Sequence, residues 1–413
     1  MKINYSLLFL IFTLIYSCDN DDSDFELVMV ATPELMSKAE FRKSVDIKSA
    51  RDINEPGKIY VYNNYIFVND IDGIHIIDNS DPRFPKKVKF ISIPGNEDIS
   101  VKNNYLFADS ATDLLVFDIS NINMISEVER LEDVFSIYDI QIPIEAQAVD
   151  YNNYNYEEDI IVGWTVKRER RKKQDNRVID VVFDGAILNN GSNAESNIGV
   201  GGSLARFQIV DNYLYTVGNY EMAIFNIQNL AEPTLANTQY AGWNIETMFQ
   251  ADDYLYLGST NGMYIYSLSN PSFPEFVSEF THWEGCDPVV VDGDYAYLTL
   301  RGGNLCGQLE SVLEIIDISD KTNPVLAARH ELENPYGLGI RENMLFVCDG
   351  TAGLKLFNKA NPLDIKQIRT LKDIQSKDVI PLQNSLLMIG GDVLYQYEYL
   401  EDNVRLISSY SLN

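Results

Sequence analysis

Residues 63–82 read NNYIFVNDIDGIHIIDNSDP and contain the unit that decides the fold. The unit is an aromatic strand led by Asn or Asp, a second apolar strand ending in a polar residue, and an Asx-Pro turn before a further strand. The aromatic strand recurs seven times, beginning at Asn64, Asn104, Asn212, Asp253, Asp294, Asn343 and Asn384. A repeat of roughly forty residues is typical of propeller blades. The sequence therefore predicts an all-β fold, a β-propeller with seven four-stranded blades.

One stretch, at about residues 136–202, interrupts this rhythm. It holds two apolar segments, 159–166 and 177–183, and then a tract rich in Gly, Asn and Ser. We interpret it as a β-hairpin insertion. Its length also fits one degenerate unit with extra loop, which leaves eight blades as the alternative. The propeller body is expected to span residues 58–413.

The N-terminus carries the features of an export signal. Lys2 precedes an apolar run over residues 7–15 that is too short to span a bilayer, so residues 1–17 are expected to be a signal peptide. The segment IYSC at residues 15–18 resembles the lipobox of bacterial lipoproteins. That resemblance implies lipidation of Cys18, with acyl chains such as palmitate serving as a membrane anchor.

An acidic tether and lead-in follows over residues 18–57. Its run of Asp and Glu at residues 19–26 resembles the signals that export some Gram-negative lipoproteins to the cell surface. The alternative is a solvated flexible tether. We therefore expect a protein anchored by lipid in the outer membrane, at the cell surface.

Bulk composition limits the partners. The 413 residues carry a formal net charge of -29, which opposes the phosphate contacts that nucleic-acid binding needs. The hydrophobic content of 46% and the 25 tyrosines suit the half-buried strands of a globular body, which we expect to be monomeric. The expected partners are the membrane, through the lipid, and an envelope protein or glycan.

The repeat also resembles a known family. HIID at residues 75–78 and LEIID at 313–317 are close to the LVIVD repeat, and the likeness extends from about Gly57 to the end of the chain. Bacterial LVIVD-repeat lipoproteins are further resembled at residues 56–61, 201–207, 286–290, 299–302 and 348–350. The resemblance implies a β-propeller and brings no established activity.

Besides Cys18 the chain has three cysteines. In an up-and-down blade, the connection before an innermost strand and the one between second and third strands emerge on the same face. Cys286 and Cys306 occupy those two connections, so we predict a disulfide between them. Cys348 ends a second strand and is predicted to be a buried free thiol.

Unusual polar residues gather on the loops of that same face. We expect the candidate binding face to consist of His282, Trp283, Glu284, Asp287, Arg301 and Tyr336. His282, Glu284 and Cys286 alternate, so their side chains could share a face, and zinc accepts nitrogen, oxygen and sulfur. A metal site needs more ligands and a thiolate, however, and a disulfide would consume that sulfur, so no metal site is assigned there.

A second set of acids begins the innermost strands. Asp98, Glu246 and Asp378, together with Asp287, are expected to ring the mouth of the central channel. Such oxygens would suit calcium, whereas the plainer interpretation is that each carboxylate caps loop amides. Both interpretations predict an acidic rim, and no cofactor is assigned.

The basic run KRERRKK at residues 167–173 stands out from the acidic background. It would suit an anionic surface such as lipid headgroups or polysaccharide, or simply form a solvated hairpin tip. The sequence contains no nucleophile elbow, phosphate-binding glycine loop or paired-histidine metal motif.

Three functions remain. The first is a cell-envelope scaffold that binds protein or glycan. The second is a propeller-type hydrolase or lyase acting on glycans, with Glu284, Asp287, His282 and Arg301 as its acid, base and charge clamp. The third is a structural role in an outer-membrane assembly.

Overall fold

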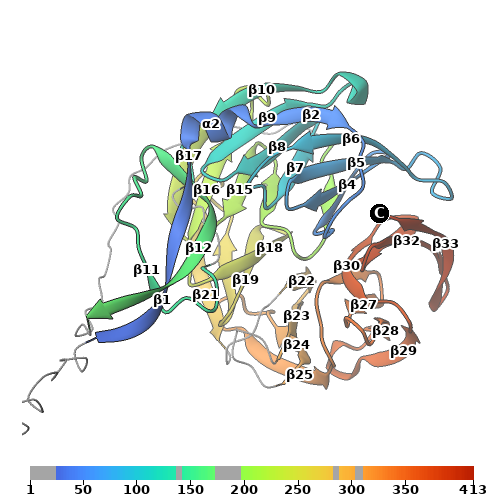
Figure 1. Cartoon of the computed structure of the whole chain (residues 1–413). Coiled ribbons are helices and arrows are strands. Elements are labelled where there is room, and N and C mark those ends of the chain that lie inside the picture. Colours follow the sequence, from blue (N-terminus) through green and yellow to red (C-terminus); the bar gives the residue numbers. More distant parts are fainter. Residues whose placement is uncertain (1–24, 136–141, 173–196, 282–287, 303–309) are drawn as a thin grey trace, which may run out of the picture. The chain divides into compact units, whose positions relative to one another are not determined.

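The computed structural model describes residues 25–135, 142–172, 197–281, 288–302 and 310–413 (Figure 1). The chain divides into two compact units. The first comprises residues 1–39 and 139–183, and the second comprises residues 40–138 and 184–413.

The second unit consists of antiparallel sheets in which strands adjacent in sequence are adjacent in space. Six of its described sheets have four strands, and they are named blades 2 to 7 in chain order. The strands are β7 Ile99–Lys102, β8 Tyr105–Ser110, β9 Asp113–Asp118 and β10 Ser126–Leu131; β14 Phe207–Val210, β15 Tyr213–Val217, β16 Glu221–Asn226 and β17 Thr234–Tyr240; β18 Ile245–Ala251, β19 Tyr254–Ser259, β20 Gly262–Ser267 and β21 Glu275–Thr281; β22 Val289–Asp292, β23 Tyr295–Leu300, β24 Val312–Asp317 and β25 Val325–Glu331; β26 Leu338–Arg341, β27 Met344–Cys348, β28 Leu354–Asn358 and β29 Lys366–Leu371; β30 Ser376–Pro381, β31 Ser385–Gly390, β32 Val393–Leu400 and β33 Asn403–Ser411.

Blade 1 has the same four-strand core with one strand added at each edge. Its core strands are β3 Ile59–Tyr62, β4 Tyr65–Asp70, β5 Gly73–Asp78 and β6 Lys86–Ser92. β2, Asp46–Ser49, pairs with the outer strand β6, and β13, Val200–Gly201, pairs with the inner strand β3. The described residues therefore contain seven sheets with the blade order, and the predicted propeller is confirmed.

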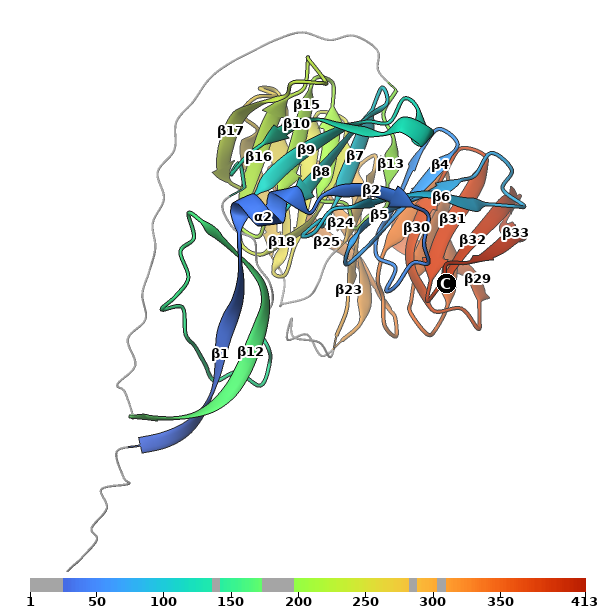
Figure 2. The same cartoon turned by 45° about the horizontal axis from the view of Figure 1, so that its top comes forward.

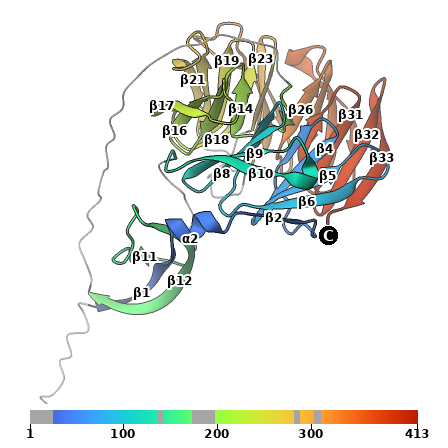
Figure 3. The same ribbon diagram turned by 90° about the horizontal axis from the view of Figure 1, so that it is seen from above.

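The innermost strands form a closed ring. Each contacts the innermost strand of the next blade, in the order β3, β7, β14, β18, β22, β26 and β30, and β30 contacts β3 again. Figures 1 and 3 show blade 7 beside blade 1. The repeats therefore close on themselves as a propeller does.

Hydrophobic side chains fill the space between every pair of neighbouring blades. The described core separates into seven clusters, one for each pair, and the last joins blade 7 to blade 1. Strand alternation explains the pattern, because successive side chains point to opposite faces of a blade. On β4, Ile66 and Val68 face blade 7 whereas Phe67 faces blade 2.

The junction of blades 1 and 7 closes without exchanging a strand. β33 completes blade 7 by itself, so the lead-in is not its fourth strand. Side chains connect the two blades instead: the Asn79 and Gln396 amides bond reciprocally at 2.9 and 2.7 Å, and Ser408 Oγ donates to the Pro82 carbonyl at 2.6 Å. The Ile53 amide also donates to the Leu412 carbonyl at 2.9 Å.

The polar residues of the repeat are turn residues. Asn63, Asn103 and Asn104 adopt positive φ in the tight turns before second strands, a conformation that Asn tolerates well. In blades 1 and 2 the acid that ends the third strand makes an Asx turn: Asp78 accepts the Ser80 amide at 2.9 Å and Asp118 accepts the Ser120 amide at 2.8 Å. The repeat motif thus encodes hairpin geometry.

The first unit is built on a long two-stranded ribbon. β1, Phe25–Ser37, pairs antiparallel with β12, Asp159–Lys172, and β11, Ala148–Val149, pairs briefly with β1 (Figure 2). The segment predicted as the first strand of an inserted hairpin therefore pairs with the lead-in. Its predicted partner, residues 177–183, lies outside the described residues. Helix α2, Lys38–Lys43, follows β1, and its buried Phe41 already belongs to the second unit.

Candidate functional site

The predicted binding face is described only in part. Arg301 and Tyr336 lie together, with the guanidinium carbon 4.2 Å from the ring centroid, a cation–π arrangement. Thr299 Oγ1 fixes the neighbouring main chain by donating to the Tyr336 carbonyl at 2.6 Å. The other members, His282, Trp283, Glu284 and Asp287, lie outside the described residues, so this face stays a prediction.

Of the three cysteines after Cys18, only Cys348 is among the described residues. Cys286 and Cys306 lie outside the described residues, and their disulfide also stays a prediction. Cys348 is fully buried at the end of β27, and burial raises the pKa of its thiol well above the usual range. The predicted buried thiol is confirmed.

Strand register shows which residues are equivalent at the channel mouth. Asp98 and Asp378 occupy the same position, one residue before the inner-strand residues that pair with Ala108 and Met388. In blade 4 that position holds Thr247, because Met248 pairs with Leu257; Glu246 lies one residue earlier.

The same register identifies the remaining members of this ring, here called the rim. In blade order they are Lys58, Asp98, Arg206, Thr247, Pro288, Gly337 and Asp378. Two cations therefore stand among two acids, and Lys58 Nζ lies 3.3 Å from Asp98 Oδ2. The rim has mixed charge and is not the acidic ring that the sequence predicted.

Asp98 serves as a bridge between blades 2 and 3. It is 5% exposed and accepts the Ile99 amide at 2.8 Å, the Phe207 amide at 3.2 Å, and the Arg206 amide. The Arg206 side chain pairs in turn with Glu97. These contacts support the interpretation of Asp98 as a cap for backbone amides.

Residues 197–206, here called the channel segment, occupy the inner side of this ring. The Gly199 amide donates to the Val101 carbonyl at 2.9 Å, and β13 then pairs with β3. Further on, Ser203 Oγ accepts the Leu338 amide at 2.8 Å, and the Ala205 carbonyl accepts the Met248 amide at 2.7 Å. The segment thus joins inner strands of blades 1, 2, 4 and 6.

Asp378 is sealed beneath the channel segment. Its side chain is fully buried, and a Cβ added at Gly202 or Gly337 would lie 2.3 or 2.7 Å from its carboxylate oxygens. Oδ1 accepts the Val379 amide at 2.9 Å, while Oδ2 has no hydrogen-bond partner among the described residues. Burial raises the pKa of Asp378 to about 7.

The rim does not assemble a metal site in the part of the chain that the structure describes. No group of three or more His, Cys, Asp or Glu side chains is close enough there to hold a metal ion. The acids of the rim instead bond protein amides or lie under Gly202.

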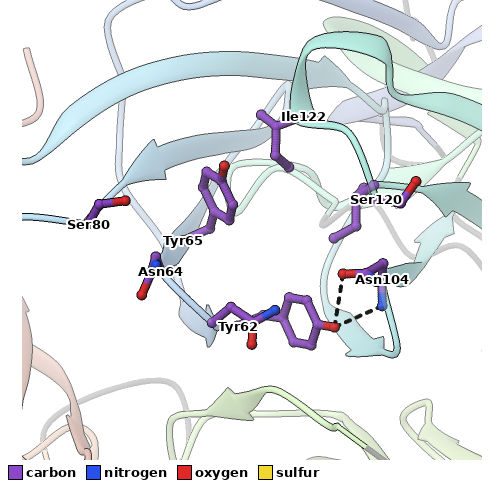
Figure 4. Close-up of a pocket in the computed structure, with 9 residues that line it drawn as sticks. Tyr62, Asn64, Tyr65, Ser80, Asn104, Ser120 and Ile122 are labelled. Carbon is purple, nitrogen blue, oxygen red and sulfur yellow. Dashed lines mark hydrogen bonds between the residues drawn. The ribbon is translucent and has the colours of Figure 1, made fainter.

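An open pocket lies at the opposite ends of the inner strands of blades 1 and 2 (Figure 4). Its volume is about 520 Å³. The lining comes from the turns between first and second strands and between third and fourth strands: Tyr62, Asn63, Asn64, Tyr65, Ser80, Asn104, Ile119, Ser120 and Ile122. All nine of these residues are uncharged.

Hydrogen bonds hold the floor of this blade 1–2 pocket. The Tyr62 hydroxyl donates to Asn104 Oδ1 at 3.1 Å and accepts the Asn104 amide at 2.9 Å, as Figure 4 shows for this pair. Asn197 of the channel segment donates to Asn63 Oδ1 at 2.9 Å. Asn64 is exposed and its side chain faces solvent. Ser80 and Ser120 are also exposed, but the Ser80 hydroxyl donates to Asp78 Oδ1 at 2.6 Å and the Ser120 hydroxyl bonds Asp118.

Sequence reasoning missed this pocket. Its residues belong to the repeat itself, so each looked like a turn or strand residue. The available signal was the consecutive pair Asn63-Asn64 facing Asn103-Asn104 in the next unit, which concentrates amides at one junction.

The described part of the chain contains no helix that is both long and apolar enough to cross a membrane.

Comparison with solved structures shows similarity of fold. The computationally designed Ika8 protein is 9% identical over 88% of this chain and 90% of its own, with a TM-score of 0.51. Hsv2 from Kluyveromyces lactis is 10% identical, covers 87% of this chain and 100% of its own, and has a TM-score of 0.47. A functionally unknown protein from Desulfotomaculum acetoxidans is 10% identical over 50% of this chain and 69% of its own, with a TM-score of 0.43. No curated protein matches the chain.

A family model matches within the propeller. It describes the LVIVD repeat and matches residues 56–89, 95–133, 251–282 and 286–331. These stretches correspond to blades 1, 2, 4 and 5, including the two that form the pocket. Blades 1, 2, 4 and 5 of this chain therefore contain LVIVD repeats.

Proposed function

We propose that this protein is a binding scaffold of the cell envelope whose blade 1–2 pocket takes a neutral glycan. One observation carries the proposal: in a chain of net charge -29, the pocket is lined by aromatic, aliphatic, amide and hydroxyl side chains without a charged one. A fold of LVIVD repeats is consistent with a binding or scaffold role.

The lining suits sugar chemistry. A sugar ring has apolar C–H faces and a rim of hydroxyl groups, so it is recognised by aromatic rings together with groups that both donate and accept hydrogen bonds. Tyr65 supplies a partly exposed ring above the buried Tyr62, and the exposed Asn64 and Asn104 supply amides. A volume of about 520 Å³ is in the usual range for a small-molecule site.

The location belongs to the same proposal. The apolar run at residues 7–15 and the lipobox-like residues 15–18 favour export and a lipid anchor at Cys18. The acidic residues that follow favour the outer membrane and the cell surface. In this setting a glycan or another envelope component is the ligand within reach.

The test is direct binding. The chain from residue 19 onward, which keeps every described residue, is titrated by calorimetry with neutral gluco-, manno- and xylo-oligosaccharides and with acidic oligosaccharides. We expect a neutral ligand to bind and Tyr65→Ala to weaken that binding at least tenfold. The matched control is Tyr254→Ala, the same position in blade 4, which should bind as the parent does.

Equal binding by Tyr65→Ala and Tyr254→Ala would contradict the assignment of the pocket. Binding of acidic oligosaccharides alone would contradict the assignment of a neutral ligand.

A further inference from the structure

The β1–β12 ribbon has two different faces in its terminal half, residues 25–30 and 167–172. Phe25 pairs with Lys172, Leu27 with Arg170 and Met29 with Arg168, whereas Glu26, Val28 and Val30 pair with Arg171, Glu169 and Lys167. Because directly paired residues lie on the same side of a sheet, the two sets lie on opposite faces.

The first face combines apolar and cationic side chains. Phe25 is 41% exposed and Leu27 is 56% exposed, and both Arg168 and Arg170 are exposed. The Arg170 guanidinium carbon lies 4.7 Å from the Phe25 ring centroid, so the cation and the ring stand together. We call Phe25, Leu27, Met29, Arg168 and Arg170 the basic face.

The opposite face is balanced in charge. Arg171 pairs with Glu169 at 3.1 Å and lies 3.9 Å from Asp150, and Glu26 is its cross-strand neighbour. The acids of the ribbon's terminal half are therefore confined to the side away from the basic face.

In the other half of the ribbon, aromatic side chains of the first unit cover this same side. Trp164, paired with Pro33, lies on the same side as Leu27, and Tyr151 packs edge-on against it with ring centroids 5.9 Å apart. Aromatic cover thus ends before the basic face begins, and the large apolar side chains there meet solvent.

We propose that the basic face docks on the anionic phospholipid surface of a membrane. Five of the chain's 32 Lys and Arg lie within residues 167–172 of β12, so the ribbon concentrates positive charge in a protein of net charge -29 that such a surface would otherwise repel. Exposed Phe and Leu beside cations are the pairing that interfacial anchors use, with rings at the headgroup boundary and cations on phosphates.

The position of the ribbon in the chain also fits a membrane. Phe25 is seven residues after Cys18. Seven extended residues reach at most about 25 Å, so a lipid on Cys18 would hold the basic face close to the bilayer. This last point rests on the anchor in the proposed function, whereas the segregation of the two faces does not.

The experiment removes the anchor and asks whether the ribbon binds alone. The chain from residue 19 is sedimented with vesicles of phosphatidylcholine, with or without phosphatidylglycerol. We expect binding only to the anionic vesicles and weaker binding at high salt, because salt screens the cations. Arg168→Glu with Arg170→Glu should reduce vesicle binding at least tenfold.

A pair of neighbouring substitutions tests the face. Leu27→Ser should weaken vesicle binding several-fold at unchanged charge, whereas Val28→Ser, one residue away on the opposite face, should leave binding close to that of the parent. Equal effects of the two, equal binding to neutral vesicles, or a charge-reversed variant that binds like the parent would overturn the proposal.

Two further outcomes are distinguishable. Capture by a soluble polyanion with no vesicle binding would assign the face to polysaccharide and overturn the lipid assignment. The vesicle assay contains neither oligosaccharide nor lipidated Cys18. A negative vesicle result therefore does not affect the glycan proposal, and a negative glycan titration does not affect the membrane proposal.

Discussion

The two ends of the inner strands differ in what their polar side chains do. At the rim, Asp98 bonds three backbone amides and Asp378 is sealed under Gly202. At the other end, the blade 1–2 pocket is open and the side chain of its Asn64 faces solvent. The acids of the rim are thus enclosed by protein, and Asp98 connects two blades, whereas the uncharged turns at the other end of the strands are open to solvent.

The largest effect is expected at the rim. Asp98→Ala should lower the free energy of unfolding by about 3 kcal/mol, because it leaves buried amides of two blades without their charged acceptor. Asp98→Asn should cost less, since one oxygen acceptor remains. Chemical denaturation measures both, and an Asp98→Ala variant within about 0.5 kcal/mol of the parent would contradict the bridging role.

Asp378 gives a pH-dependent effect. Its pKa of about 7 in the folded protein exceeds the value of roughly 3.9 expected when unfolded. Between these values the native state keeps a proton that the unfolded state has lost, so the contribution of Asp378 to stability falls as pH rises from about 4 to about 7. Asp378→Asn should therefore raise Tm at pH 8 by a few degrees and change it little at pH 4.

The informative measurement for Asp378→Asn is the difference between its change in Tm at pH 8 and its change in Tm at pH 4. Asp109, whose pKa is raised by burial and by the Glu97 carboxylate, keeps its own pH dependence in the variant. An equal change of Tm at pH 4 and pH 8 would show that packing against Gly202, and not ionisation, determines the result.

Two buried tyrosines differ in whether their hydroxyl group is hydrogen-bonded, and substitution by phenylalanine compares them. Tyr62→Phe should lower the free energy of unfolding by about 1 kcal/mol, because its hydroxyl bonds both the amide and the side chain of Asn104. Tyr256→Phe should be neutral or slightly stabilising, since the buried Tyr256 hydroxyl has no hydrogen-bond partner among the described residues. Thermal denaturation of both variants checks this, and a larger loss for Tyr256→Phe would contradict it.

The smallest effect on stability is expected in the pocket wall. Asn64→Ala should change the free energy of unfolding by less than about 0.5 kcal/mol, because the side chain is exposed, while glycan binding weakens. Asn384→Ala, the equivalent residue of blade 7, is the control and should leave both properties unchanged. A substantial loss of stability with Asn64→Ala would mean that the pocket wall is structural, as the rim is.

The repeat made the blades predictable from sequence, because each unit carries its own strands and turn residues. Cys348 was predictable for the same reason, since an apolar second strand ends there. These features depend on local pattern, and the fold preserves local pattern.

The features that the sequence did not predict depend on strand register and on pairing between distant segments. Glu246 looked equivalent to Asp98 by residue type, but the pairing of Met248 with Leu257 puts Thr247 at that position. Lys58 and Arg206 were overlooked because the rim was aligned on acids. The pairing of β12 with β1 and of β13 with β3 joins segments more than 120 residues apart, and no local signal reports it.

The most direct test of the account is a crystal structure of the protein with the neutral oligosaccharide that binds it best in titration. We expect the sugar to be bound between Tyr62, Tyr65 and Asn104, with the channel segment still in place over Asp378. A sugar bound at the rim beside Asp98, or on Arg301 and Tyr336, would contradict it.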